Sequence, residues 1–207
     1  MSSPPNKNRT ATLCLTVKED AISTFLPLLA QGFTLKTRVG CSVQEMLCSQ
    51  FGLDADYFEH RLQTIFLDGK AVDNVKAAVV RHGSTLALSA AMPGMVGATL
   101  RRCGVYASMR HEITHKNTPT KETVKEGTVM LKLFNLVAGD IGPRFLKQGI
   151  WIKGKNLQVF FRKAPDHFWA GCRAAEIDGR HLEVDKLSNL DWGQQQVFLK
   201  LRVKLTR

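Results

Sequence analysis

The chain has 207 residues, of which 44% are hydrophobic, and its formal net charge is +11 at pH 7. This composition suits one large or two small packed domains and excludes a generally disordered chain. No apolar run is long enough to span a bilayer, and the polar first nine residues lack the apolar middle of a signal peptide. We therefore expect a cytoplasmic protein without membrane insertion.

The first strands and the first helix are indicated by simple patterns. Residues 1–10 form a polar tail, and alternating apolar residues predict strands at 12–17 and 33–39. Ser42 and Glu45 then form an S-x-x-E capping box, in which each side chain satisfies a backbone N–H of the first turn. The sequence therefore predicts a helix over residues 43–51.

Two further strands and a tight turn follow this helix. Residues 65–67 and 85–88 are short apolar runs typical of buried strands. Asp68-Gly69 predicts a hairpin turn, because both central positions of a type I′ turn need positive φ. The positions expected in the core of this domain are Met46, Leu47, Phe51, Ile65, Leu67, Leu86 and Leu88.

The order strand, capped helix, strand, turn, strand resembles a β-grasp, or ubiquitin-like, fold. Within the expected domain at 11–94, residues 12–94 are similar to the sulfur-carrier proteins of thiamine and molybdopterin synthesis, on the shared pieces Val39-Gly40-Cys41-Ser42-Val43, Leu67-Asp68-Gly69-Lys70 and the Gly83 turn. The resemblance implies a fold that presents a surface to a partner. In that family a C-terminal Gly-Gly is the reactive end, and the matching place here is Met92-Pro93-Gly94-Met95, after which the chain continues.

Residues 95–127 are expected to be a helical connector and linker. Small residues favour close packing of Pro93 to Gly97 at an interface, and Pro93 and Gly94 are therefore candidates for partner contact. Arg101-Arg102-Cys103-Gly104 resembles the basic, glycine-ending tail of ubiquitin-like modifiers, so Arg101 and Arg102 are further candidates.

His111-Glu112-Ile113-Thr114-His115 matches the H-E-x-x-H pattern of zinc hydrolases. On a helix, His111 and His115 would stand one turn apart and could hold one Zn²⁺, with Glu112 as the general base. The third ligand of the extended motif is absent, because Thr118 and Lys121 occupy the positions of its glycine and histidine. A polar helix end explains the same residues, so we expect no cofactor and keep a zinc hydrolase as an alternative.

Residues 128–207 are expected to be a second, β-rich and basic domain. Strands are predicted at 128–134, 149–153, 157–161 and 197–205, with a turn at 153–156. Residues 116–207 hold 17 of the 29 lysines and arginines, interleaved with aromatic residues, which is a pattern that can bind nucleic acid. The candidate contacts are Lys153, Lys155, Arg162 and Lys163.

The sequence as a whole predicts an α+β protein with a β-grasp domain followed by a β-rich domain. We expect a non-enzymatic interaction or adaptor protein whose partner is another protein. Zinc-dependent hydrolysis through residues 111–115 is the first alternative, and nucleic-acid binding by the basic C-terminal part is the second.

Overall fold

The computed structural model describes residues 10–116 and 122–204. These residues form a mixed α/β protein that divides into two compact units. Unit 1 combines residues 1–33 with residues 141–207, and unit 2 comprises residues 34–140. Unit 2 is thus inserted in the chain of unit 1, whereas the sequence patterns suggested two domains in succession with limits at 94 and 127.

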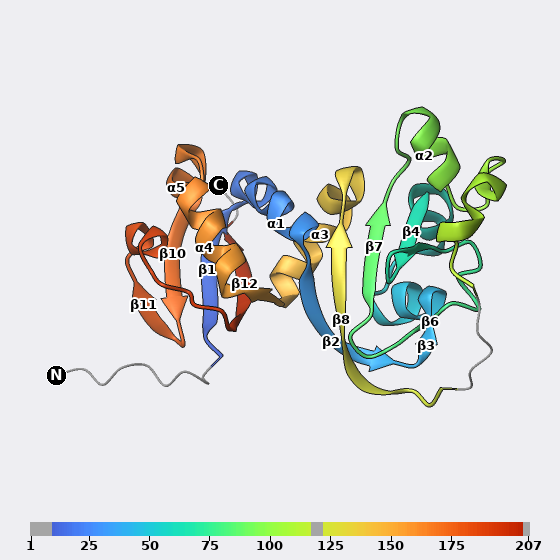
Figure 1. Ribbon diagram of the computed structural model, residues 1–207. Helices are drawn as coiled ribbons and strands as arrows, with labels where there is room; N and C mark the ends of the chain where they lie inside the picture. The colour runs from blue at the N-terminus through green and yellow to red at the C-terminus, as the bar shows by residue number, and fades with distance from the viewer. Residues whose placement is uncertain (1–9, 117–121, 205–207) are drawn as a thin grey trace. The chain divides into compact units, whose positions relative to one another are not determined.

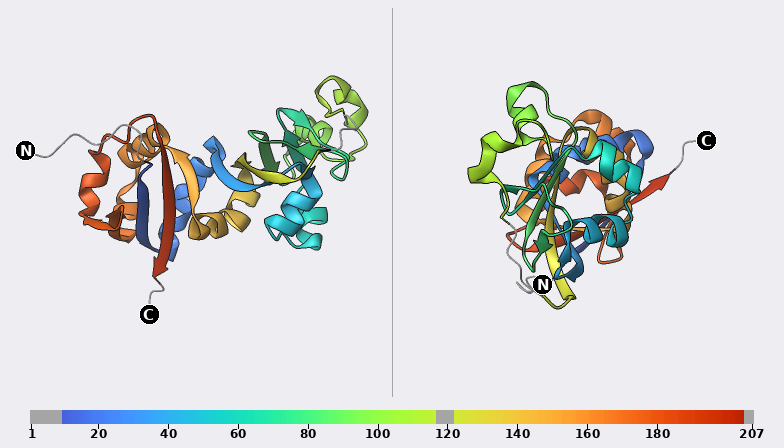
Figure 2. Two further views of the ribbon diagram at one scale, coloured as in Figure 1. Left: turned by 90° about the horizontal axis from the view of Figure 1, so that it is seen from below. Right: turned by 90° about the vertical axis from the view of Figure 1, so that its right-hand side faces the viewer.

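Unit 1 is built on five strands in the order β11-β10-β1-β12-β9. β1 (Thr12–Lys18) runs parallel to β12 (Gln196–Lys204) and antiparallel to β10 (Cys172–Ile177). β12 also pairs with β9 (Ile150–Lys153), and β10 with β11 (Arg180–Leu182). The first and last strands of the chain therefore lie side by side, as Figure 2 shows.

The helices of unit 1 contribute aromatic side chains to its core. They are η1 (Glu19–Phe25, 3₁₀), α1 (Leu26–Gln31), α4 (Gly154–Lys163), α5 (Asp166–Gly171) and η5 (Val184–Ser188, 3₁₀). Phe25 stacks on Phe160, and Phe168 meets both rings edge-to-face, with ring centroids 4.8–5.5 Å apart. Stacked and edge-to-face aromatic pairs add to the stability that burial provides.

The predicted strand at 157–161 is wrong, because these residues belong to α4. Leu157, Phe160 and Phe161 are the buried residues of this stretch, and their spacing of three and four is that of a helix face. The expected turn at 153–156 is the start of the same helix, which Gly154 begins. A Cβ at Gly154 would lie 2.2 Å from the carbonyl oxygen of Trp192, so only glycine fits there.

The larger sheet part of unit 2 has the strand order β2-β8-β7-β4-β5. These strands are β2 (Phe33–Val39), β8 (Lys125–Leu133), β7 (Thr85–Ser89), β4 (Thr64–Leu67) and β5 (Lys70–Ala71). The first residue of β2, Phe33, precedes the start of unit 2 at residue 34. β7 is parallel to β8 and antiparallel to β4 (Figure 1). β3 (Cys41–Ser42) and β6 (Val79–Val80) form a separate antiparallel pair.

Helical segments complete unit 2. The helix predicted after Ser42 is present over residues 43–50. At its beginning the Glu45 N–H donates to Ser42 Oγ at 3.1 Å. Its second part is a π-helical stretch, η2 (Glu45–Gln50). η3 (Tyr57–Arg61), α2 (Gly94–Leu100) and η4 (Ala107–Ile113) follow. α3 (Asn135–Gln148) begins in unit 2 and continues into unit 1.

The core and the turn of unit 2 agree with the sequence predictions. All seven positions expected in the core, from Met46 to Leu88, are buried. Asp68 and Gly69 have φ of 50° and 77°, as a type I′ turn requires. The strand at 12–17 is the exception, because it belongs to unit 1 and pairs with β10 and β12. The remaining predicted strand, 197–205, is confirmed as β12 over its described part.

Candidate functional site

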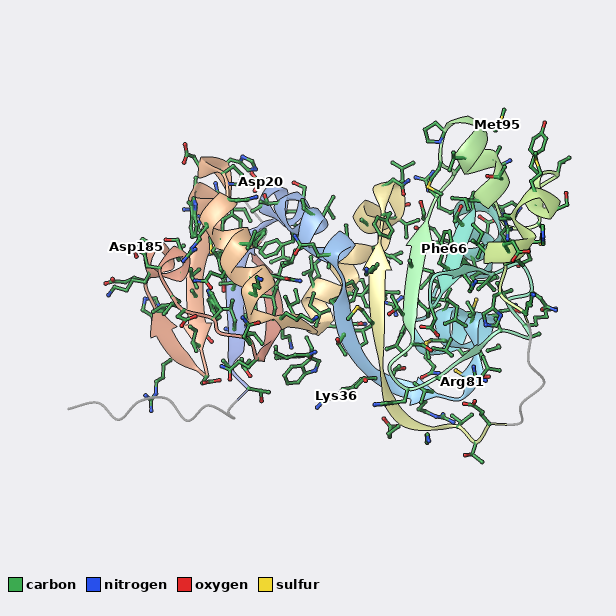
Figure 3. All side chains as sticks on the ribbon, viewed as in Figure 1. Asp20, Lys36, Phe66, Arg81, Met95 and Asp185 are labelled. Atoms are coloured by element: carbon green, nitrogen blue, oxygen red, sulfur yellow. The ribbon has the colours of Figure 1, made fainter. Side chains whose placement is uncertain are left out.

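The most distinctive surface of unit 2 is the segment 92–113, which contains α2 and η4. Ten large hydrophobic side chains are exposed among the described residues, and six of them belong to this segment. We call these six the apolar surface: Met95, Val96, Val105, Tyr106, Met109 and Ile113. Figure 3 shows Met95 on the side of α2 that faces away from the sheet. Exposed apolar residues gathered in one short segment mark an interaction site more often than scattered ones do.

A buried arginine holds this segment in place. Arg110 is only 5% exposed, and its guanidinium donates to the carbonyl oxygen of Thr99 at 2.7 Å and to Thr114 Oγ1 at 3.0 Å. It also donates to Asp73 Oδ1 at 2.6 Å and to the carbonyl oxygen of Arg101 at 3.3 Å. One side chain thus ties α2, η4 and the loop at Asp73 together.

A second arginine fixes the turn between α2 and η4. The guanidinium of Arg102 lies 4.8 Å from the ring centroid of Phe58 and donates to Glu59 Oε2 at 3.0 Å. The Arg102 backbone N–H donates to the carbonyl oxygen of Gln63 at 2.7 Å, and the Cys103 N–H donates to Asp73 Oδ1 at 2.8 Å. The predicted partner-binding pair therefore separates: Arg102 is bound within unit 2, and Arg101 is exposed.

The start of α2 combines exposure with one very close contact. Pro93, Gly94, Met95 and Val96 are exposed, whereas Gly97 is buried. A Cβ at Gly97 would lie 2.0 Å from the carbonyl oxygen of Met92, so the helix packs back onto the preceding turn. The expected packing of 93–97 within the chain is thus present at Gly97 and absent at Met95 and Val96. Gly94 begins a helix and is not the end of a tail.

A pocket of about 390 Å³ opens beside α2. It lies on the face of the sheet opposite the core: Thr64 pairs with Ser89 and Phe66 with Ala87, while Ile65, Leu67, Leu86 and Leu88 point the other way. The lining residues from other elements are Met92 and Leu100, which flank the apolar surface, and Phe134 and Asn135.

Three polar side chains line this otherwise apolar pocket. Ser89 Oγ donates to Asn135 Oδ1 at 2.8 Å, and Asn135 has a positive φ of 42° at the start of α3. Thr64 is 1% exposed, and its hydroxyl has no hydrogen-bond partner among the described residues. Buried polar atoms almost always have a partner, so the Thr64 hydroxyl is an unusual feature of this pocket.

The H-E-x-x-H residues do not form the expected helical pair. η4 ends at Ile113, and Thr114 is extended with ψ of 136°, so His115 lies beyond the helix. His111 Nε2 contacts Glu112 Oε1 at 2.9 Å, with side chains 78% and 83% exposed, while the His115 backbone N–H donates to the carbonyl oxygen of Ala71. Within residues 10–116 and 122–204, no three His, Cys, Asp or Glu side chains are grouped as metal ligands. Thr118 and Lys121 lie outside the described residues.

The basic candidates of unit 1 are distributed along α4. Lys153 and Lys155 lie at its beginning, Arg162 and Lys163 at its end, and all four are exposed. The aromatic residues between them do not offer a stacking surface, because Phe160, Phe161, Phe168 and Trp192 are buried against one another. These four rings are therefore not available for the base stacking on which single-strand binding depends, whereas Trp151 and Trp169 are half-buried.

Burial disfavours the thiolate form of two of the cysteines. Burial raises the pKa of the Cys172 thiol to about 11, and burial followed by the charge of Glu45 raises the pKa of Cys41. The thiolate is the reactive form, so neither residue is suited to be a nucleophile.

Sequence reasoning did not identify Arg110 and Thr64. Each is a polar residue whose burial depends on segments far away in sequence: Arg110 on Asp73, and Thr64 on the strand that holds Ser89. No local pattern marks either residue.

No helix in the described parts of the chain is long and apolar enough to cross a membrane. Comparison with family models, with curated proteins and with solved structures found no match for this chain.

Proposed function

We propose that this chain is a non-enzymatic interaction or adaptor protein, and that the apolar surface of unit 2 is where it meets a partner protein. The observation that supports this is the combination of exposure and order in segment 92–113. Six large hydrophobic side chains face solvent, while Arg102 and Arg110 beneath them are bound to unit 2. A surface that is ordered before binding loses little conformational entropy when a partner arrives. Methionine and tyrosine are enriched in protein interfaces, and both occur in the apolar surface.

We further propose that unit 2 is a rearranged β-grasp domain. In support, the strand order β2-β8-β7-β4-β5 has a parallel pair at its centre and antiparallel strands outside β7. The strand parallel to β7 is β8, which comes last in unit 2, and the strand at 12–17 belongs to unit 1. A β-grasp domain usually acts through a binding surface, which agrees with an adaptor role. Sulfur-carrier chemistry is not part of the proposal, because Gly94 starts a helix.

The alternatives have less support in the arrangement of their residues. A zinc hydrolase requires His111 and His115 on one helical face, and η4 ends before His115. A nucleic-acid interface requires exposed aromatic residues among the basic ones, and four of those in unit 1 are buried.

Site-specific crosslinking tests the proposal. A photoreactive amino acid at Val105, which is 91% exposed, should form discrete crosslinks to a partner protein in cells that produce this chain naturally. Val159, exposed at 39% on α4 of unit 1, is the matched control position. Met95→Glu with Met109→Glu should remove the crosslinks from position 105 without lowering the melting temperature, because both methionines are in solvent. Identical crosslinks from both positions, or none from 105, would contradict the proposal.

A further inference from the structure

The sheet of unit 1 has one buried face and one face that carries positive charge. Side chains point to alternate faces along a strand, and along β12 Leu199 and Leu201 are buried while Lys200 and Arg202 are exposed. The pairing of β12 with β1 and β9 extends this outer face to alternate residues of both neighbours. We call it the basic sheet face, and its cations are Lys18, Lys153, Lys200, Arg202 and Lys204.

Two aromatic rings lie on the basic sheet face beside these cations. Phe198 of β12 pairs with Trp151 of β9, and their ring centroids are 5.1 Å apart. A Cβ at Gly149 would lie 2.2 Å from the Phe198 ring, so this ring rests against the backbone of the glycine. Both rings are half-buried and therefore keep part of their surface in solvent. Aromatic rings in such a position can stack with the bases of a single strand.

The cations of β12 form a row with regular spacing. A strand rises about 3.3 Å per residue, so Lys200, Arg202 and Lys204 follow one another at steps of about 6.6 Å. This step is close to the distance between successive phosphates in an extended single strand. At the outward positions of the described strands of this sheet, Glu176 provides the one carboxylate, and Arg202 Nη1 donates to its Oε1 at 2.8 Å. The face as a whole is therefore strongly positive.

We infer that the basic sheet face binds single-stranded nucleic acid, with a base stacked on Trp151 and the following phosphates along the cations of β12. A row of cations beside aromatic rings is the arrangement that single-strand binding uses. A double helix fits less well, because its bases stack on one another and present no free face to a ring. An acidic protein would meet the cations but would bring no base to Trp151. The inference goes beyond the proposed protein interaction and does not depend on it, because all these residues belong to unit 1.

The first test measures the contribution of the row of cations. Fluorescence anisotropy with oligo(dT) and oligo(rU) of about twelve nucleotides gives the affinity of the full-length protein at several salt concentrations. For single strands, the logarithm of the binding constant falls with the logarithm of the salt concentration by about 0.7 per phosphate contact. Lys200→Gln with Lys204→Gln should therefore reduce this slope by about 1.4. Absence of binding by the original protein at low salt would overturn the inference.

A matched pair of lysines on α4 controls for net charge. Lys155→Gln with Lys163→Gln removes the same charge from the helix that contributes Leu157 and Phe160 to the core, and should leave the slope unchanged. Equal losses in the two double variants would show that net charge alone attracts the probes, and would overturn the inference. Glu176→Gln releases Arg202 from its exposed ion pair and should tighten binding about 2–5-fold. Weaker binding in Glu176→Gln would count against the inference.

The second test concerns the ring of Trp151. Trp151→Leu should weaken binding about 5–150-fold, the usual effect of removing a ring on which a base stacks, and should leave the salt slope unchanged. Trp151→Phe retains a ring and should recover most of the affinity. The melting temperature of each variant shows whether it folds. Original affinity in a folded Trp151→Leu variant would overturn the inference.

Competition identifies the class of ligand. Double-stranded DNA that displaces the probe as well as a single strand of equal length would overturn the assignment to single strands. Polyglutamate that displaces it equally well would indicate an acidic protein and also overturn the inference. Tighter binding of oligo(rU) than of oligo(dT) would assign RNA, and the reverse would assign DNA. Met95→Glu with Met109→Glu should leave the affinity unchanged, so this inference and the proposed protein interaction can fail separately.

Discussion

Arg110 is the residue on which the order of the apolar surface depends most directly. Replacing it with methionine removes its hydrogen bonds to Thr99, Asp73, Thr114 and Arg101 at once, while the Cys103 N–H still donates to Asp73 Oδ1. Breaking a buried ion pair by removing one partner typically costs about 3–5 kcal/mol. Since Asp73 is 30% exposed and can be rehydrated, we expect the lower end of this range in denaturant unfolding. Arg110→Met should also speed proteolysis between 92 and 116. Arg101→Met is the control, because the Arg101 side chain is exposed, and comparable destabilisation there would contradict this account.

Leu67 tests the core beneath the same sheet. It is 1% exposed on β4 and faces the core together with Ile65, Leu86 and Leu88. Leu67→Ala should therefore reduce the free energy of unfolding by about 2–5 kcal/mol, the usual range for emptying a core site. Met95→Ala, on an exposed side chain, should change it by less than about 0.5 kcal/mol. Similar losses in the two variants would show that Leu67 is not part of the core.

At the scale of single residues, periodic patterns predicted burial well and missed isolated polar residues. The short apolar runs at 65–67 and 85–88 correctly predicted which leucines are buried, because only the neighbours in sequence matter for that assignment. Arg110 and Thr64 could not be found in this way. Their environment is provided by Asp73 and Ser89, which come from elsewhere in unit 2.

The close contact at the start of α2 makes a prediction about the helix as an element. Any side chain at Gly97 must displace the Met92 carbonyl, which a Cβ would approach to 2.0 Å. Gly97→Leu should therefore lower the melting temperature, with a loss of about 1–3 kcal/mol or more, since overfilling a packed contact is destabilising. Gly139→Ala in α3 is the matched control, because a Cβ there meets nothing within 4 Å. It should be neutral or stabilising by up to about 1 kcal/mol. An unchanged melting temperature for Gly97→Leu would mean that α2 does not pack on Met92.

The end of η4 leads to a prediction about zinc. His111 is exposed, and His115 lies past the end of the helix. We expect protein purified without added metal to hold far less than one zinc per chain by elemental analysis. His111→Ala should leave the melting temperature nearly unchanged, because its side chain is 78% exposed. Stoichiometric zinc that disappears in both His111→Ala and His115→Ala would instead favour the hydrolase alternative.

Elements were predictable where one local signal pointed to one structure. The Ser42 cap and the Asp68-Gly69 turn are of this kind: Ser42 Oγ accepts from the Glu45 N–H, and both turn residues have positive φ. The short apolar stretch 157–161 fits strand and helix patterns equally well, and its assignment depended on what it packs against. In the structure Phe160 packs against Phe25 and Phe168, and the stretch is helical.

The whole molecule depends on strand pairings between distant parts of the chain, which no local pattern encodes. Unit 1 needs β12 at its centre, between β1 and β9. A chain that ends at residue 195 should therefore lose hydrogen-exchange protection of Leu13 and Leu15 in unit 1. Leu86 and Leu131 of unit 2 should stay protected, because their strands pair with each other. A chain that ends at residue 204 is the control. Equal loss of protection in both units would show that unit 2 depends on unit 1.

The insertion of unit 2 also sets an order of events during translation. Unit 2 is complete once residue 140 has been synthesised. In contrast, β1 cannot pair with the whole of β12 until residue 204, the last residue of β12, has been synthesised. At synthesis rates of roughly 5–20 residues per second, the ribosome needs about 3–13 s for the intervening stretch. Throughout that time Leu13, Leu15 and Val17 are without their β12 neighbours, so we expect these apolar side chains to stay accessible to a chaperone for longer than the core of unit 2.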